Sequence, residues 1–157
     1  MSQGNDMQLT LVRHGEAAPA DMLNDAKRPL TTRGQQQAQQ TAAYLAANIQ
    51  PDVFVVSPLL RAQQTLGCLQ ALFPNVPVVI CDAIKPEDDA KIAIEWLSYL
   101  PYESIVVVCH MNVVAHIQAK LEQESFRPFA LAEARIFEQP VIAAGFSSYK
   151  KSFIPSL

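Results

Sequence analysis

Arg13 and His14 are adjacent at the end of an apolar run, and together they suit chemistry on a phosphoryl group. Arginine has a permanent charge and a planar fork of donors that matches phosphate oxygens. Histidine can serve as a neutral nucleophile near physiological pH. Gly15 follows them and, having no Cβ, lets the backbone approach a ligand closely. The motif Leu-Val-Arg-His-Gly-Glu at residues 11–16 is also compatible with an ordinary polar turn, so the rest of the sequence has to decide.

Two more polar residues stand close behind apolar segments. Arg61 lies shortly after the Val-rich residues 53–56, and His110 directly follows the apolar residues 105–109. The carboxyl ends of parallel strands meet at one edge of an open sheet, where ligand crevices form. The sequence therefore predicts that His14, Arg61 and His110 lie together at this edge.

Each of these residues also has a purely structural interpretation. An isolated arginine such as Arg61 is most often a surface residue, and a lone histidine such as His110 is most often a core residue. Ser57, which precedes Pro58, suits a helix cap better than a nucleophile, since no Gly-x-Ser-x-Gly surrounds it. His116 is expected to be structural. The structural interpretations would have to hold independently at several strand ends, which favours a phosphate site.

The hydrophobic periodicity predicts an alternation of strands and helices. Alternation into an apolar segment predicts a strand at residues 8–13, and short apolar runs rich in Val and Ile predict strands at residues 53–56, 76–81 and 105–109. These strands are expected to be buried on both faces of a largely parallel sheet. Helical spacing predicts helices at residues 33–48, 59–73, 88–100 and 112–124. Residues 134–137 and 146–153 predict late strands that form an antiparallel edge, after a surface loop at 128–132. The expected fold class is α/β, a three-layer α/β/α sandwich with a mostly parallel central sheet.

Size and composition predict a soluble chain with a single domain over residues 1–157, of which 1–6 form a flexible tail. Half of the residues are hydrophobic and 17% are charged, which excludes a disordered protein. The apolar runs are shorter than the roughly 18 residues of a membrane helix, and no secretory signal is visible. The net charge of −3 excludes a broad nucleic-acid footprint. Cys68, Cys81 and Cys109 are expected to be buried reduced thiols, which favours a cytoplasmic location.

Five of the twelve Lys and Arg residues lie near the candidate motifs. They are Arg13, Lys27, Arg28, Arg33 and Arg61, a placement that favours a local anionic ligand. Residues 28–34 introduce the first predicted helix, which Thr31 or Thr32 can cap, and its free N–H groups add positive potential. A metal site is not expected, because Arg13 would repel a cation and no ligand cluster is visible.

The ordered motifs resemble those of the histidine phosphatase superfamily, also called phosphoglycerate mutase-like. They are Leu-Val-Arg-His-Gly-Glu, Arg-Pro-Leu-Thr before the first helix, Ser-Pro-Leu-Leu-Arg-Ala with Gln-Thr, and the strand that ends in His110. The short chain is most similar to the SixA-type phosphohistidine phosphatases. This resemblance implies that His14 is a nucleophile that becomes phosphorylated and that Arg13, Arg61 and His110 hold the phosphoryl oxygens. Gly15, Arg28 and Ser57 are expected to complete the substrate-binding pocket.

The resemblance implies hydrolysis of a phosphohistidine intermediate without a metal or cofactor. No leaving-group acid stands out, and Glu16, Asp82 and Glu87 are the candidates. Asn112 stands where many relatives have a proline after the second histidine. Because the Asn112 side chain can cap the next helix, we expect the phosphate pocket to survive with an altered helix entry.

The strand-to-helix connections leave little room for a lid, and an open pocket suits a phosphorylated side chain on a protein. The leading hypothesis is a phosphohistidine phosphatase whose partner is a histidine-phosphorylated protein, such as a phosphotransfer domain of a bacterial signalling relay. The alternatives are a phosphatase or mutase of small phosphate esters and a non-catalytic phosphate-binding module. The sequence does not determine the oligomeric state.

Overall fold

The computed structural model describes residues 6–20 and 24–157, so residues 1–5 of the tail expected at residues 1–6 lie outside the described part. The strands there are β1 (Met7–Arg13), β2 (Val53–Val56), β3 (Val78–Ile80), β4 (Ser104–Cys109), β5 (Ala134–Gln139) and β6 (Ser148–Phe153). The helices are the short 3₁₀ helix η2 (Asp25–Lys27), α1 (Thr32–Asn48), α2 (Leu60–Leu72), α3 (Ala90–Ser98) and α4 (Val113–Glu122). Among these described residues, no helix is long and apolar enough to cross a membrane.

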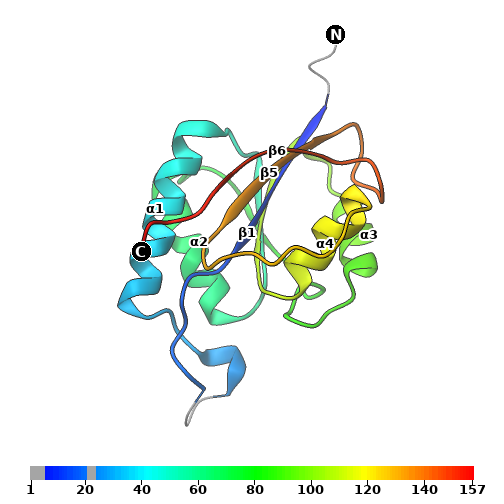
Figure 1. Cartoon of the computed structure of the whole chain (residues 1–157). Coiled ribbons are helices and arrows are strands. Elements are labelled where there is room, and N and C mark those ends of the chain that lie inside the picture. The colour runs from blue at the N-terminus through cyan, green and yellow to red at the C-terminus, as the bar shows by residue number, and fades with distance from the viewer. Residues whose placement is uncertain (1–5, 21–23) are drawn as a thin grey trace.

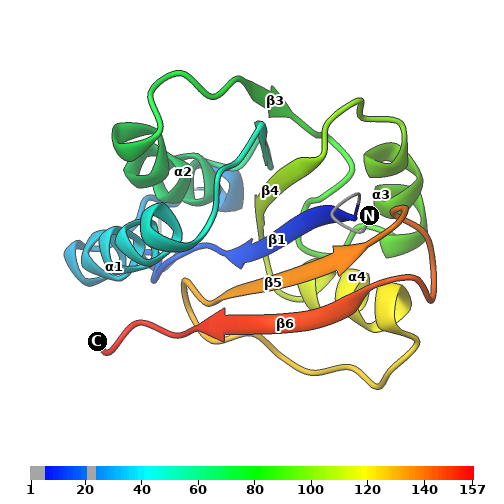
Figure 2. The same ribbon diagram turned by 90° about the horizontal axis from the view of Figure 1, so that it is seen from above.

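The strands form one mixed sheet in the order β3-β2-β4-β1-β5-β6. The first four are mutually parallel, whereas β5 pairs antiparallel with both β1 and β6. Helices α1 and α2 cover one face of the sheet, and α3 and α4 cover the other (Figure 1; Figure 2). The predicted α/β/α sandwich with an antiparallel edge is therefore confirmed.

Alternation of side chains along each central strand builds two separate cores. Leu9 and Leu11 of β1 pack in the core under α3 and α4, while Val12 packs in the core under α1 and α2. β2 and β4 carry apolar residues at both sets of positions, because both faces of a parallel sheet are covered by helices. This explains why β2 and β4 read as continuous apolar runs, whereas β1 also contains the polar residues Gln8 and Thr10.

The strand predicted at residues 76–81 is wrong in length and in burial. Only Val78–Ile80 form β3, at the edge of the sheet, and Val78 and Ile80 are 38% and 58% exposed. Enrichment in Val and Ile does not distinguish an edge strand from a central strand, because both kinds of strand favour β-branched residues.

The loop expected at the surface over residues 128–132 is partly buried. Phe129 is 2% exposed, and Ala132 is fully buried with a positive φ of 57°. The N–H of Ala132 donates to the carbonyl of His14, at 3.0 Å, so this segment lies against the end of β1. All three cysteines are free, but only Cys81 and Cys109 are buried as expected, because Cys68 lies partly exposed on α2.

Candidate active site

The structure brings His14, Arg61 and His110 together beyond the carboxyl ends of β1, β2 and β4. The ring centroids of His14 and His110 are 5.1 Å apart, and Arg61 Nε lies 3.3 Å from His14 Nε2. The hydrogen-bond ladder of the sheet continues one residue beyond the strands, because His14 N–H donates to the Cys109 carbonyl at 3.1 Å. The sheet itself therefore fixes the separation between these side chains.

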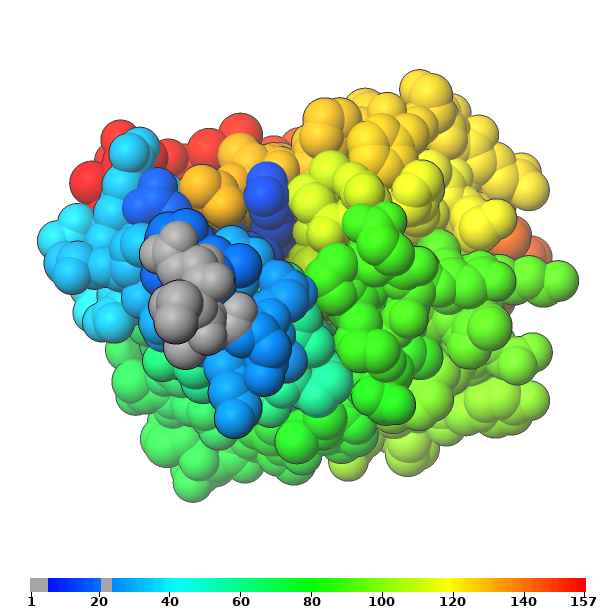
Figure 3. Space-filling view, turned by 90° about the horizontal axis from the view of Figure 1, so that it is seen from below, coloured from blue at the N-terminus to red at the C-terminus, as the bar shows by residue number. Residues whose placement is uncertain are grey.

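In the space-filling view this end of the molecule is hollowed (Figure 3). Dark-blue atoms from the N-terminal part of the chain lie between the blue segment that contains η2 and the orange segment that precedes β5. The yellow-green start of α4 forms a further side of this hollow. The hollow is thus bordered by segments that lie far apart in the sequence.

His14 is held as one defined tautomer. Its Nδ1 lies 2.6 Å from the carbonyl oxygen of Gly15, which can only accept, so Nδ1 carries the proton. Nε2 is then unprotonated, and its lone pair accepts from Arg61 Nε–H at 3.3 Å. Burial, with smaller contributions from Arg61 and Arg13, lowers the pKa of His14 to about 4. A neutral imidazole with an unprotonated Nε2 is the form that can attack phosphorus.

His110 is fully buried and pairs with Ser57 rather than with the backbone. Its Nε2 lies 2.7 Å from Ser57 Oγ, while Nδ1 has no hydrogen-bond partner among the described residues. Burial, followed by the nearby His14 and Arg61, lowers the pKa of His110 to about 2. The capping role predicted for Ser57 is wrong, because α2 has Leu59 at its N-cap and no side-chain cap. Ser57 Oγ instead accepts from Leu59 N–H and lies against His110.

Arg61 lies in the first turn of α2, where it is 4% exposed. One turn later, Thr65 ties this helix to the loop after β1. Its hydroxyl donates to the Arg61 carbonyl at 2.9 Å and accepts from Gly15 N–H at 3.1 Å. Thr65 was part of the quoted motif, but its spacing alone did not indicate this bridge.

Gly15 is required by a close backbone crossing. A Cβ on Gly15 would lie 2.4 Å from the carbonyl oxygen of Gly34, and a Cβ on Gly34 would lie 2.0 Å from that of Glu16. The loop after β1 thus presses against the first turn of α1, which Thr31 caps by accepting from Gly34 N–H. The helix cap predicted at Thr31 or Thr32 is therefore Thr31.

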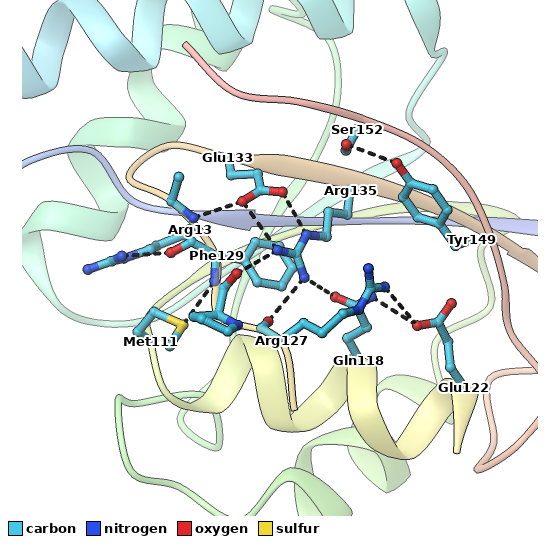
Figure 4. Close-up of polar contacts among 12 residues, drawn as sticks. Arg13, Met111, Gln118, Glu122, Arg127, Phe129, Glu133, Arg135, Tyr149 and Ser152 are labelled. Carbon is cyan, nitrogen blue, oxygen red and sulfur yellow. Dashed lines mark hydrogen bonds and ion pairs between the residues drawn. The ribbon is translucent and has the colours of Figure 1, made fainter. Parts of the chain in front are cut away.

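Arg13 approaches the site from the other side of His14. Its Nη1 donates to the Phe129 carbonyl at 2.8 Å, whereas its buried Nε has no partner among residues 6–20 and 24–157. Burial lowers the pKa of Arg13, which nevertheless stays charged at neutral pH. Behind Phe129 lies a buried ion pair between Arg135 and Glu133 (Figure 4). Sequence analysis did not identify this pair, because a charged residue within a strand gives no signal of burial.

Arg28 reaches the site through a residue that sequence analysis missed. Asp25 of η2 accepts from Arg28 Nη1 at 2.9 Å and from Arg61 Nη2 at 3.1 Å. Arg28 also donates from Nε to the carbonyl of Ala18. The spacing of Asp25 and Arg28, one helical turn apart, was an available signal for this pairing.

The candidate acids have other partners in the structure. Glu16 accepts a hydrogen bond from Thr31 at 2.8 Å, and the side chain of Asp82 is 90% exposed beside Lys85. Within the described part of the chain, no hydrogen bond joins Glu16, Asp82 or Glu87 to the converging histidines and arginines.

Asn112 stands at the N-cap position of α4, but its side chain makes no capping hydrogen bond. Its amide donates instead to both carboxylate oxygens of Glu87, at 3.0 and 3.2 Å. The prediction that the Asn112 side chain caps the helix is therefore wrong. His116 lies exposed on α4, with its ring 4.7 Å from that of Phe126. In the described residues, no group of three or more His, Cys, Asp or Glu side chains could hold a metal ion.

Comparisons with known proteins agree with this geometry. A family model described as the histidine phosphatase superfamily (branch 1) matches residues 9–85. The phosphohistidine phosphatase SixA of Escherichia coli (strain K12) is 33% identical over 123 residues, which make up 73% of this chain and 74% of that protein. The chain belongs to the histidine phosphatase superfamily. The resemblance stated from the motifs is thereby confirmed.

Other members of the histidine phosphatase superfamily are similar as well. A solved structure of the protein histidine phosphatase SixA complexed with tungstate has a TM-score of 0.85 and 27% identity, covering 95% of this chain and 97% of that one. The 5''-phosphoribostamycin phosphatase of Niallia circulans is 36% identical over 80 residues, which are 46% of this chain and 38% of that protein. Membership and these similarities support phosphatase activity.

Proposed function

We propose that the protein is a phosphohistidine phosphatase that removes phosphate from a histidine-phosphorylated protein. His14 is the nucleophile, and Arg13, Arg61 and His110 hold the phosphoryl oxygens. The observation that carries the proposal is the hydrogen bond between His14 Nδ1 and the Gly15 carbonyl, which leaves Nε2 unprotonated beside Arg61. Similarity to the phosphohistidine phosphatase SixA supports the class of substrate.

In the first step, His14 Nε2 attacks phosphorus, and the P–N bond to the substrate histidine breaks. The departing imidazole takes a proton from solvent. Because imidazole is a better leaving group than an alkoxide, this step needs less acid catalysis. Two guanidinium groups neutralise charge on the phosphoryl oxygens, and the neutral His110 donates a hydrogen bond to one of them. Removal of one such electrostatic contact typically costs about 100- to 1000-fold in rate.

In the second step, water attacks the phosphorus on His14 and releases inorganic phosphate. The proton on Nδ1 stays hydrogen-bonded to the Gly15 carbonyl, so the phosphorylated ring is cationic and leaves readily. Ser57 has a supporting role in the proposal. When its hydroxyl donates to His110 Nε2, the Nδ1–H of His110 is the free donor for a phosphoryl oxygen.

This mechanism uses only side chains of the chain itself, and we therefore propose that it is independent of metals. A histidine phosphotransfer domain of a signalling relay is the proposed type of partner. The cytoplasmic location expected from the cysteines stays a prediction. Activity that persists in excess chelator would agree with metal independence, and loss that is restored by a divalent cation would contradict it.

The decisive experiment is a substrate panel with purified protein. It compares a histidine-phosphorylated phosphotransfer protein, p-nitrophenyl phosphate and sugar phosphates by their kcat/KM values. We expect the phosphoprotein to be hydrolysed with the highest kcat/KM. Much faster turnover of small esters would instead support a phosphatase or mutase of small phosphate esters, a function that the name of the Niallia circulans relative also favours.

A trapping experiment tests the covalent intermediate. Brief incubation with radiolabelled substrate and acid-free quenching should leave label on the wild type but none on His14→Ala. His116→Ala is the matched control, because it removes an exposed histidine from α4, away from the converging strand ends. Equal labelling of wild type and His14→Ala, or no turnover of any substrate, would contradict the proposed nucleophile, and the latter would favour a phosphate-binding module.

A further inference from the structure

The carboxylate of Asp25 bridges the two arginines at the mouth of the site. One of its oxygens accepts from Arg28 Nη1 at 2.9 Å, and the other accepts from Arg61 Nη2 at 3.1 Å. The backbone carbonyl of the same residue accepts from Arg61 Nη1 at 2.8 Å. The Asp25 carboxylate therefore already contacts the guanidinium groups that are expected to bind a phosphoryl group.

We propose that Asp25 is a specificity-determining residue: its carboxylate occupies the phosphoryl site of the free protein and gives way only to an anion that binds more strongly. This inference rests on the proposed function, since it concerns the same pocket. It assigns a role to a residue outside the motifs that define the pocket.

The two arginines beside His14 differ in a way that supports this assignment. In the described part of the chain, the guanidinium of Arg13 makes one hydrogen bond, to the Phe129 carbonyl, and its Nε is unpartnered. Arg61 has a partner on each of its three nitrogens: His14 on Nε and Asp25 on both Nη atoms. An incoming phosphoryl group can therefore bind Arg13 directly, but has to replace the Asp25 carboxylate on Arg61.

The Asp25 side chain can make this exchange by rotating into water. It is 57% exposed, whereas the side chain of Arg61 is 5% exposed. The hydrogen bond from Arg28 is the largest cause that lowers the pKa of Asp25, so the carboxylate is ionised at neutral pH. Because the backbone carbonyl of Asp25 also holds Arg61, the guanidinium keeps one of its anchors when the carboxylate leaves.

The exchange discriminates between anions by charge. A dianionic phosphoryl group gains more from the two arginines than the monoanionic carboxylate that it displaces, whereas a free carboxylate ligand gains nothing. The bound carboxylate also weakens retention of the product phosphate, because it competes from within the chain. If it occupies Arg61 about 80–95% of the time, apparent phosphate affinity falls about 5- to 20-fold.

The test is direct binding of inorganic phosphate to the full chain by isothermal titration calorimetry. Asp25→Asn and Asp25→Ala should each bind phosphate about 5- to 20-fold more tightly than the wild type. Glu95→Gln is the control for loss of a negative charge, because Glu95 lies exposed on α3. We expect its phosphate affinity to equal that of the wild type. In steady-state assays with p-nitrophenyl phosphate, both Asp25 variants should have a lower KM.

Several results would overturn the inference without affecting the proposed function. These are unchanged or weaker phosphate binding by both Asp25 variants, and a fall in kcat that outweighs the change in KM, which would indicate an acid or base. A crystal structure of the wild type with phosphate provides the second test. Persistence of the contact between Asp25 Oδ2 and Arg61 Nη2 in that complex would exclude displacement. Failure of His14 labelling, in contrast, would overturn the proposed function and leave the binding result standing.

Discussion

Replacement of Arg135 by Met should destabilise the protein strongly. Arg135 lies on β5 beneath the segment that holds Arg13, and its guanidinium carbon is 3.8 Å from the centroid of the Phe129 ring (Figure 4). Its donors serve four groups that surround it: the Glu133 carboxylate, the Gln118 side chain, and the backbone carbonyls of Arg127 and Pro128. The side chains of Arg135 and Glu133 are 9% and 6% exposed.

The magnitude follows from the charge that the substitution leaves behind. Arg135→Met keeps an unbranched apolar side chain over Phe129, but the buried Glu133 carboxylate retains only the Ala130 N–H as a donor. Breaking a buried ion pair by removing one partner costs about 3–5 kcal/mol. Since a domain of ordinary stability has about 5–15 kcal/mol in total, this is a large share.

Urea unfolding of wild type, Arg135→Met and Glu133→Gln/Arg135→Met measures the free energies of unfolding. The double variant should be more stable than Arg135→Met, because a neutral amide costs less to bury and still accepts from Ala130. Arg127→Met is the matched control. Arg127 has a 51% exposed side chain paired with Glu122, so its loss should cost about 1 kcal/mol or less. If Arg135→Met costs no more than Arg127→Met, the reasoning about the buried pair is refuted.

Three further predictions concern the site. Gly34→Ala should lower the free energy of unfolding, because its Cβ would lie 2.0 Å from a carbonyl oxygen, whereas Gly67→Ala in the open middle of α2 should raise it by about 1 kcal/mol; equal chemical-denaturation midpoints would contradict this. Arg61→Lys should lower kcat/KM about 100-fold or more, because an ammonium cannot reproduce the guanidinium fork beside His14, and near-normal turnover would disprove the role. Folding lowers the pKa of His110 to about 2, below the unfolded value of about 6.5. As the pH decreases below about 6.5, the unfolded chain therefore binds a proton that the folded chain does not bind, and the free energy of unfolding decreases. Between pH 7 and pH 5, the free energy of unfolding, measured with urea, should decrease by about 2 kcal/mol less in His110→Asn than in the wild type. Equal decreases in the two proteins would contradict this prediction.

Much of the fold was predictable because it depends on local patterns. Continuous Val and Ile runs identified the central strands, and the alternation with helices indicated the sandwich. A threonine cap at Thr31 or Thr32 followed from the residue type before a helical segment, and the structure selects Thr31. Edge position was not predictable in the same way. β3 has the composition of a central strand, and only strand order shows that one of its sides has no neighbour.

The candidate site was also predictable only in part. The convergence of His14, Arg61 and His110 follows from strand topology, which the sequence already implied. The side-chain partners did not, because Ser57 had two competing uses, as a cap and as a neighbour of His110. Asn112 likewise had both a helix N-terminus and the Glu87 carboxylate within reach.

The amino-acid sequence by itself determined the family, the three-layer architecture and the residues suited to phosphoryl chemistry. Their motifs are local in the chain, and their positions at strand ends follow from periodicity. Only the tertiary structure decided which tautomer His14 adopts, which partner saturates Arg61, and that Arg135 is buried with Glu133. These properties depend on contacts between segments far apart in sequence, and on the loss of water around them. Residue types and their spacing do not specify these contacts or this loss of water.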